Sequence, residues 1–254
     1  MTVAIEENTL IRDIEERCLN ACPPLQQVLY DGWVIRLADG YTRRANSISP
    51  IYPGHRDVAE KIPVCEGLYR GRGLRPIFKM TPLNAPVDLD DVLAVRGYQK
   101  EAETLVEALN LYRVVIPKTG AVQVWTRPEP EWFDTYIRLK ELSEYEIGAF
   151  QNILDNLAVP ARFVLLMDGD TAVAGGFTIR EGEFAGLFGL VTDANRRNRG
   201  YGRLLVWTLL NRARMAGART AYLQVEATNA PARKVYETIG FQEVYRYWYR
   251  VLES

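Results

Sequence analysis

The stretch Arg197-Asn198-Arg199-Gly200-Tyr201-Gly202 follows an apolar run, residues 187–191, and precedes a helical run, residues 203–216. A strand, a basic glycine turn and a helix in this order bring backbone N–H groups and the positive end of a helix dipole to one point. Gly200 and Gly202 let the backbone approach an anion closely, because neither residue has a Cβ. The stretch therefore predicts a phosphate-binding turn, and a βα turn with solvated arginines is the alternative.

Composition limits the class of protein. With 254 residues, 48% of them hydrophobic, the chain can bury a full core as one large or two small domains. A formal net charge of −1 argues against a nucleic-acid or anionic-membrane surface, despite the arginines of residues 196–203. We find no secretory signal and no apolar run long enough for a bilayer, and therefore expect a cytoplasmic protein without a membrane partner. The single histidine, His55, excludes a multi-histidine metal site, and we expect no metal.

Hydrophobic periodicity predicts helices and strands along the whole chain. We expect helices at residues 11–21, 55–69, 91–96, 132–142, 147–157, 203–216 and 231–238, and strands at residues 33–37, 75–80, 122–125, 163–167, 172–179, 187–191, 222–225 and 244–251. The best candidate linker is Arg127-Pro128-Glu129-Pro130, because two prolines close together continue neither helix nor sheet. We place a domain boundary near residues 125–130.

A second pattern, Asn229-x-x-Ala232-x-x-x-Tyr236-x-x-x-Gly240-Phe241, follows the glycine turn after a helix and a strand. In combination, the two patterns resemble the GCN5-related N-acetyltransferases (GNAT), whose acetyl-CoA signature is [Gln/Arg]-x-x-Gly-x-[Gly/Ala]. The resemblance covers roughly residues 130–254. It implies an α+β fold with a central mixed, mostly antiparallel sheet, splayed between the two strands that flank the acetyl-CoA site, and with helices on both faces.

The resemblance also implies an activity: direct transfer of an acetyl group from acetyl-CoA to a primary amine, without a metal. The pyrophosphate of coenzyme A would bind the backbone N–H groups of residues 198–202, and the pantetheine arm would pair with the strand edge at residues 190–192. Asn229 would hold that arm. The cofactor-binding residues implied in this way are Leu190, Val191, Thr192, Arg197, Asn198, Arg199, Gly200, Tyr201, Gly202, Asn229 and Ala232.

Three residues are candidates for the chemistry. The resemblance places the N–H of Leu190 against the thioester carbonyl, where it would stabilise a developing oxyanion. It makes Tyr236 the acid that protonates the leaving thiolate; a phenol is neutral at pH 7 and has a proton to donate, whereas simple ring packing is the alternative. The glutamate base of histone-acetylating relatives corresponds to Gly186 here. Glu226 and Glu183 are the substitutes to test, although either can be a solvated carboxylate, and the amine can also arrive deprotonated.

A degenerate copy of the second pattern occurs in the first half of the chain. Cys65-x-x-x-Tyr69-x-x-x-Gly73-Leu74 has the spacing of Ala232, Tyr236, Gly240 and Phe241, but no Arg-x-x-Gly-x-Gly turn precedes it. We therefore expect two GNAT-like domains in tandem, a degenerate one at residues 1–126 and an acetyl-CoA-binding one at residues 127–254. A chance match of spacing is the alternative. A fused pair favours a monomer over a dimer.

Two other functions compete with catalysis. A catalytically inactive coenzyme A-binding or regulatory module is consistent with Gly186 at the position of the missing glutamate. A nucleic-acid-binding protein that uses residues 196–203 is disfavoured by the overall charge. The sequence does not identify the acceptor, which can be a small-molecule or a peptide amine.

Overall fold

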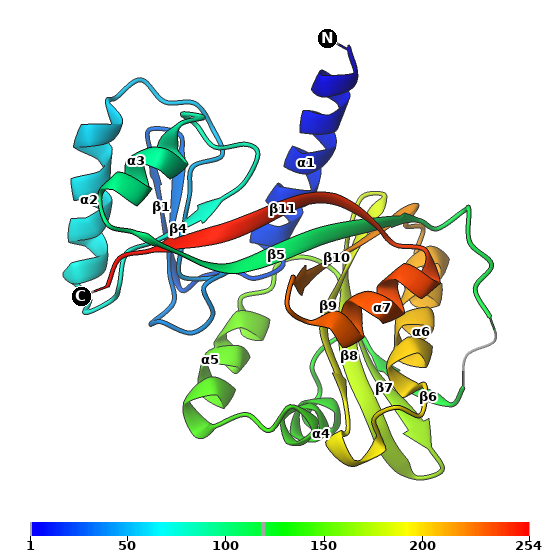
Figure 1. The fold of residues 1–254 in the computed structure, drawn as a ribbon. Coiled ribbons are helices and arrows are strands. Elements are labelled where there is room, and N and C mark those ends of the chain that lie inside the picture. The colour runs from blue at the N-terminus through cyan, green and yellow to red at the C-terminus, as the bar shows by residue number, and fades with distance from the viewer. Residues whose placement is uncertain (1, 118–119, 254) are drawn as a thin grey trace. The chain divides into compact units, whose positions relative to one another are not determined.

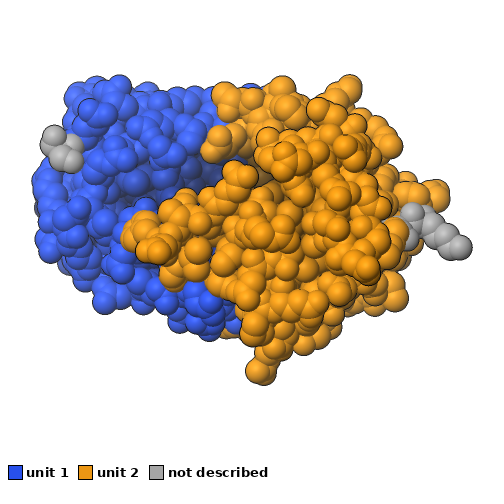
Figure 2. All heavy atoms as spheres, turned by 90° about the horizontal axis from the view of Figure 1, so that it is seen from below, with its two compact units in different colours: residues 1–105, 149–157, 244–254 blue, residues 106–148, 158–243 orange. Residues whose placement is uncertain are grey.

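The structure is a computed structural model that describes residues 2–117 and 120–253. It forms two compact units (Figure 2): unit 1 comprises residues 1–105, 149–157 and 244–254, and unit 2 comprises residues 106–148 and 158–243. Two long strands, β5 (Gln99–Asn110) and β11 (Gln242–Val251), have residues in both units, and so does helix α5 (Glu144–Asp155).

Unit 1 is built on strands in the order β1-β2-β3-β4-β11. Figure 1 labels β1, β4 and β11 of this series. Its pairs are antiparallel except for β3 and β4, which run parallel. The remaining elements of this unit are α1 (Thr2–Asn20), β1 (Gln26–Tyr30), β2 (Trp33–Leu37), β3 (Ile48–Ser49), α2 (Val58–Arg70), β4 (Ile77–Met80) and α3 (Leu89–Val95).

Unit 2 contains the strand order β10-β9-β8-β7-β6. Only β9 and β10 are parallel in this series, so the sheet is mixed and mostly antiparallel. Its elements are β6 (Val122–Trp125), α4 (Pro130–Lys140), β7 (Ala161–Asp168), β8 (Thr171–Glu181), β9 (Phe184–Thr192), the short helix η1 (Ala194–Arg196), α6 (Tyr201–Met215), β10 (Thr220–Glu226) and α7 (Ala230–Ile239).

Helices cover both faces of the unit 2 sheet. A Cβ on Gly175 of β8 would lie 3.5 Å from the ring of Tyr136 in α4, whereas a Cβ on the next residue, Gly176, would lie 3.5 Å from Leu209 in α6. Because successive residues of a strand point to opposite faces, α4 and α6 pack on opposite sides of β8. The α+β class, the mixed and mostly antiparallel sheet and the helices on both faces are therefore confirmed.

The predicted elements are present with shifted ends, whereas β1, β3, β5 and the short helix η1 were not predicted. Pro130 of the expected linker lies in the first turn of α4, with Glu129 before it at the N-cap, so the linker leads directly into a helix. No pattern in the sequence predicted β5, the twelve-residue strand Gln99–Asn110. Its many Ala, Glu and Leu residues are helix formers, and here sheet pairing outweighs local propensity.

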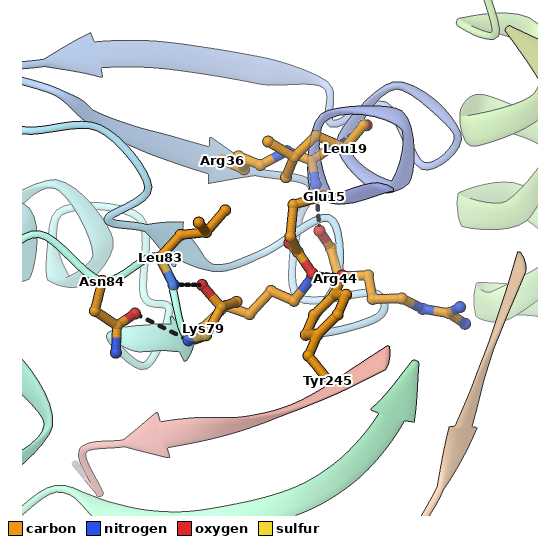
Figure 3. Close-up of polar contacts among 9 residues, drawn as sticks. Glu15, Leu19, Arg36, Arg44, Lys79, Leu83, Asn84 and Tyr245 are labelled. Atoms are coloured by element: carbon orange, nitrogen blue, oxygen red, sulfur yellow. Dashed lines mark hydrogen bonds and ion pairs between the residues drawn. The ribbon is translucent and has the colours of Figure 1, made fainter. Parts of the chain in front are cut away.

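A buried ion pair joins three elements of unit 1 (Figure 3). The Nζ atom of Lys79 in β4 lies 2.6 and 2.8 Å from the two carboxylate oxygens of Glu15 in α1. The hydroxyl of Tyr245 in β11 donates a hydrogen bond to the same carboxylate. Lys79 also lies over the ring of Tyr247, 4.1 Å from its centroid. All four side chains are buried, so the polar atoms of Glu15, Lys79 and Tyr245 depend on one another for partners.

Candidate functional site

In unit 2, β9 and β10 separate before either strand ends. Their parallel pairing covers residues 184–186 of β9 and stops at Tyr222 of β10. Beyond that point β9 continues to Thr192 and β10 to Glu226, and the described residues show no further register between the two strands. The edge of β9 at residues 190–192 is therefore free of β10, and an extended ligand can pair with such an edge.

A β-bulge lies in β9 beside this separation. The register between β8 and β9 shifts there, so that Gly189 and Leu190 together oppose Gly176. Gly189 has a φ of 61°, and a Cβ on it would lie 2.5 Å from the hydroxyl of Tyr136, so only glycine fits. A bulge leaves its extra residue without a ladder partner. Leu190, which the resemblance makes an N–H donor, thus lies where β9 departs from regular pairing.

The glycine turn forms the start of α6, as predicted. Gly200 is the N-cap with a φ of 83°, and no side chain caps the helix. The N–H of Leu204 donates to the carbonyl oxygen of Gly200 at 3.0 Å, so the N–H groups of residues 201–203 have no acceptor within the helix. Asn198 is also left-handed, with a φ of 61°. This backbone presents several donors at the positive end of a helix dipole.

A pocket of about 510 Å³ opens at this turn. Arg199 and Arg203 contribute cations to it, and Trp207 contributes an aromatic ring. The walls are formed by Pro117, Arg199, Gly200, Tyr201, Arg203, Leu204, Trp207 and Thr238. The pocket therefore joins the start of α6 to the end of α7, and its basic lining favours an anionic ligand.

Contacts to two neighbouring strands hold the turn in place. The Tyr201 hydroxyl donates to Asp168 Oδ2 at 2.7 Å, and Arg196 lies 2.9 Å from the same oxygen. The hydrogen bond to Asp168 raises the pKa of Tyr201. A Cβ on Gly202 would lie 3.4 Å from the Thr192 hydroxyl, so the first turn of α6 contacts the end of β9. Arg197 is exposed and extends the basic surface of the turn.

Helix α7 brings the second pattern together. Asn229 is its N-cap, and its Oδ1 accepts a hydrogen bond from the N–H of Ala232 at 3.2 Å. Tyr236 is only 8% exposed and packs edge-on against Phe241. The structure gives its hydroxyl no hydrogen-bond partner among the described residues. Burial, and then the charge of Glu107, raise the pKa of Tyr236 to about 12, so the phenol keeps its proton at neutral pH.

The three positions considered for a base differ in their surroundings. A Cβ on Gly186 would lie 2.4 Å from the Phe188 ring and 2.7 Å from the Tyr222 ring, so no side chain fits there. Glu183 forms an exposed ion pair with Arg219 at 3.0 Å, next to the paired start of β9. Glu226 is exposed at the end of β10, on the separated side.

Glu107 in β5 was not predicted as a functional residue. This glutamate is 7% exposed, and its Oε2 is buried without a hydrogen-bond partner among the described residues. The signal available in the sequence was a single carboxylate inside the otherwise apolar run Leu105 to Leu109. Recognising it required knowing that this run is a strand packed beside α7.

The described residues contain neither a metal-binding cluster nor a membrane-spanning helix. No group of three or more His, Cys, Asp or Glu side chains is arranged to hold a metal ion. None of the helices within residues 2–117 and 120–253 is both long and apolar enough to cross a membrane.

The chain is similar to one protein family and one protein over almost its whole length, and to another enzyme over a short segment. Residues 9–250 match the family described as "Probable histone acetyltransferase Rv0428c C-terminal". The "Uncharacterized N-acetyltransferase YobR" of Bacillus subtilis is 27% identical over 248 residues, which cover 95% of this chain and 98% of that protein. The [ribosomal protein bS18]-alanine N-acetyltransferase of Salmonella typhimurium is 39% identical over 59 residues, covering 23% of this chain and 40% of that enzyme.

Solved structures show the same fold. A GCN5-related N-acetyltransferase from Kribbella flavida has a TM-score of 0.70 at 17% identity, with 95% of each chain covered. A tandem GNAT protein from the clavulanic acid biosynthesis pathway has a TM-score of 0.62 at 14% identity, with 82% of this chain and 76% of that chain covered.

Proposed function

Because the chain belongs to the family described as "Probable histone acetyltransferase Rv0428c C-terminal" and has the GNAT fold, we propose that it transfers an acetyl group from acetyl-CoA to a primary amine. The general activity, that of a GNAT-type N-acetyltransferase without a specified donor or acceptor, follows from the relatives. The observation that supports the donor is the combination of an uncapped, glycine-led start of α6 with the free edge of β9 beside it.

The start of α6 fits a pyrophosphate. The N–H groups of residues 198–202 would donate to phosphate oxygens, and the open space at Gly200 lets the ligand approach the backbone. Arg197, Arg199 and Arg203 would add charge-assisted contacts. Tyr201 contributes through its hydrogen bond to Asp168, which fixes the turn.

Residues further along would bind the rest of the donor. The edge of β9 at Leu190, Val191 and Thr192 would pair with the amide groups of the pantetheine arm. Asn229 uses Oδ1 to cap α7, so its Nδ2 is the atom that would donate to the arm. Ala232 has already committed its N–H to that cap, and its small side chain would leave room for the ligand.

We assign the chemical roles as follows. The N–H of Leu190 would stabilise the negative charge that develops on the thioester oxygen during attack. Tyr236 would protonate the leaving thiolate, which agrees with its retained proton and its unpartnered hydroxyl. Glu226 is the better of the two carboxylates for accepting the amine proton, because Glu183 is paired with Arg219.

Calorimetric titration with acetyl-CoA tests the binding half of this proposal. Gly200→Glu adds a side chain and a negative charge at the phosphate site, and it should abolish binding that the parent protein shows. Gly182→Glu is the matched control, because Gly182 has a similar left-handed φ of 59° and equally open surroundings in a turn at the opposite end of β9. No heat of binding with the parent protein would overturn the proposal.

The amine acceptor is the least defined part of the proposed reaction. The bS18-alanine N-acetyltransferases are named for a ribosomal protein substrate, and the matching family is named for histones, so we propose protein or peptide amines as the first class to screen. Release of free coenzyme A in the presence of peptides with a free N-terminus, peptides with lysine, and small amines would rank these classes. Release with none of them would favour an inactive coenzyme A-binding module, which the missing glutamate at Gly186 supports.

We also propose that residues 1–126 and 127–254 are a tandem pair, the first degenerate. Helices α2 and α7 end alike: Leu74 N donates to Tyr69 O at 3.0 Å, and Phe241 N donates to Tyr236 O at 3.1 Å. Tyr69 donates its hydroxyl to the Arg36 carbonyl, so it has no free proton donor for catalysis. The two compact units do not coincide with these two halves of the sequence, because β5 and β11 each have residues in both units.

A further inference from the structure

The carboxylate of Glu107 lies buried without the partners that such a group normally has. Its Oε2 accepts no hydrogen bond among the described residues, and no cation lies within ion-pair distance of it in that part of the chain. On α7, the buried Nε of Arg233 is also unpartnered, while its Nη1 donates to the carbonyl oxygen of Ala227 at 3.0 Å. Native proteins retain few buried orphan groups, and each calls for an explanation.

The topology of unit 2 places this carboxylate opposite Tyr236. Glu107 and Leu109 share one face of β5, because side chains alternate along a strand. A Cβ on Gly240 would lie 3.6 Å from Leu109 Cδ1, so the end of α7 contacts that face. Arg233, Tyr236 and Gly240 follow one another at helical spacing and form one stripe of α7. The stripe that carries the tyrosine therefore meets the face that carries the glutamate.

The charged groups near Tyr236 and Glu107 show which charge affects the tyrosine. Burial is the largest cause of the raised pKa of Tyr236, and among the described residues the charge of Glu107 adds to it. Burial also raises the pKa of Glu107 itself, whereas Arg233 lowers it. The charged groups that act on Glu107 are Arg233 and Glu237 of α7 and Glu243 of β11. The other charged residues of α6, α7 and β10 are Arg203, Arg212, Arg214, Lys234 and Glu226.

We propose that Glu107 is a positioning residue that keeps the Tyr236 hydroxyl in its protonated, proton-donating form at alkaline pH. The inference rests on the proposed role of Tyr236 as the acid. An amine attacks only after losing its proton, and the pKa of a free lysine amine is about 10.4. An enzyme with such an acceptor needs an acid that is still protonated at the pH at which the amine is neutral. A nearby carboxylate supplies this, because ionising the phenol beside it would place two negative charges together.

Titration of Tyr236 itself tests the proposal without requiring turnover. The protein is labelled with 3-fluorotyrosine, whose fluorine makes the phenol more acidic and brings its titration into the range where the protein is folded. The ¹⁹F resonance of residue 236 is assigned by its absence in Tyr236→Phe. In Glu107→Gln we expect this resonance to titrate at a lower pH than in the parent protein, with only part of the raised pKa lost because burial remains.

Glu237→Gln is the matched control. Glu237 follows Tyr236 directly but is exposed and paired with Lys234 at 2.9 Å, so its removal should leave the titration unchanged. An unchanged titration in Glu107→Gln would overturn the proposal. Should Glu107→Gln not fold, Glu107→Leu removes the same charge and is read in the same way.

Kinetics provides the second measurement. The kcat of Glu107→Gln should begin to fall at a lower pH than that of the parent on the alkaline side, while its value near pH 7 changes little. A merely structural role predicts a uniform loss at all pH values. Absence of any acetyl transfer in the parent would count against the proposed function alone, because the ¹⁹F titration reports on the Glu107 charge independently.

Discussion

At position 186 the chain has no room for a side chain. We expect Gly186→Ala to lower the free energy of unfolding by about 1–3 kcal/mol, because its Cβ would lie 2.4 Å from Phe188 and 2.7 Å from Tyr222. Gly67→Ala, in the middle of α2 with nothing within 4 Å, should instead stabilise by about 0.5–1 kcal/mol. Urea unfolding measures both. Equal stability of Gly186→Ala and the parent would show that the two rings can move aside.

A second prediction at this scale concerns Tyr236. Tyr236→Phe should lower kcat by roughly a hundredfold or more, since a positioned general acid contributes about that much. Its acetyl-CoA affinity should stay the same, because the ring and its packing on Phe241 remain. Steady-state kinetics and calorimetry separate the two effects. Tyr112→Phe, at an exposed tyrosine of the same unit, controls for the loss of a hydroxyl, and an unchanged kcat in Tyr236→Phe would remove the residue from the mechanism.

Among the elements, α7 combines a structural and a binding role in one residue. Asn229→Asp retains an oxygen for the N–H of Ala232, so the melting temperature should change little. It replaces the Nδ2 donor by an acceptor, and we expect acetyl-CoA to bind about tenfold more weakly, the value of one lost hydrogen bond. Asn229→Ala should lose about 1 kcal/mol of stability as well. Full affinity in Asn229→Asp would show that residue 229 only caps the helix.

Short-range patterns account for the elements that could be predicted. The turn before α6 and the ends of α7 depend on glycine, proline and asparagine at fixed offsets, so the sequence located them. Strand β5 was missed because its Ala, Glu and Leu residues favour a helix locally, and its strand state depends on pairing with distant segments. Glu107 was missed with it, since its position opposite α7 is a tertiary contact that no spacing encodes.

For the molecule as a whole, the Glu15–Lys79 pair is the contact whose loss we expect to cost most. Glu15→Gln leaves the buried Lys79 ammonium without its anion, and unit 1 should lose about 3–5 kcal/mol in urea unfolding. The double variant Glu15→Met/Lys79→Met should recover most of that loss, because apolar side chains replace buried pairs well. A small effect of Glu15→Gln alone would indicate that water reaches Lys79.

The same ion pair predicts that the protein loses stability at alkaline pH. Burial, the largest influence, lowers the pKa of Lys79, but the Glu15 carboxylate together with Tyr247 and Cys18 outweighs it, and the pKa is raised above its ordinary 10.5. A raised pKa in the folded state contributes stability that is complete below about pH 10 and is lost as the pH rises through the folded value. Melting temperatures should therefore fall above pH 10 in the parent and fall less in Glu15→Met/Lys79→Met. Identical slopes would contradict this assignment.

The hydrogen bond between Tyr245 and Glu15 spans 230 residues of sequence. A ribosome adds roughly 5–20 residues per second, so Glu15 is synthesised on the order of ten to fifty seconds before Tyr245. During that interval the nascent chain must keep Lys79 and the exposed edge of β4 from wrong associations, since β11 has not yet been made. Unit 1, although it holds the earlier part of the sequence, is the unit whose biosynthesis is completed last.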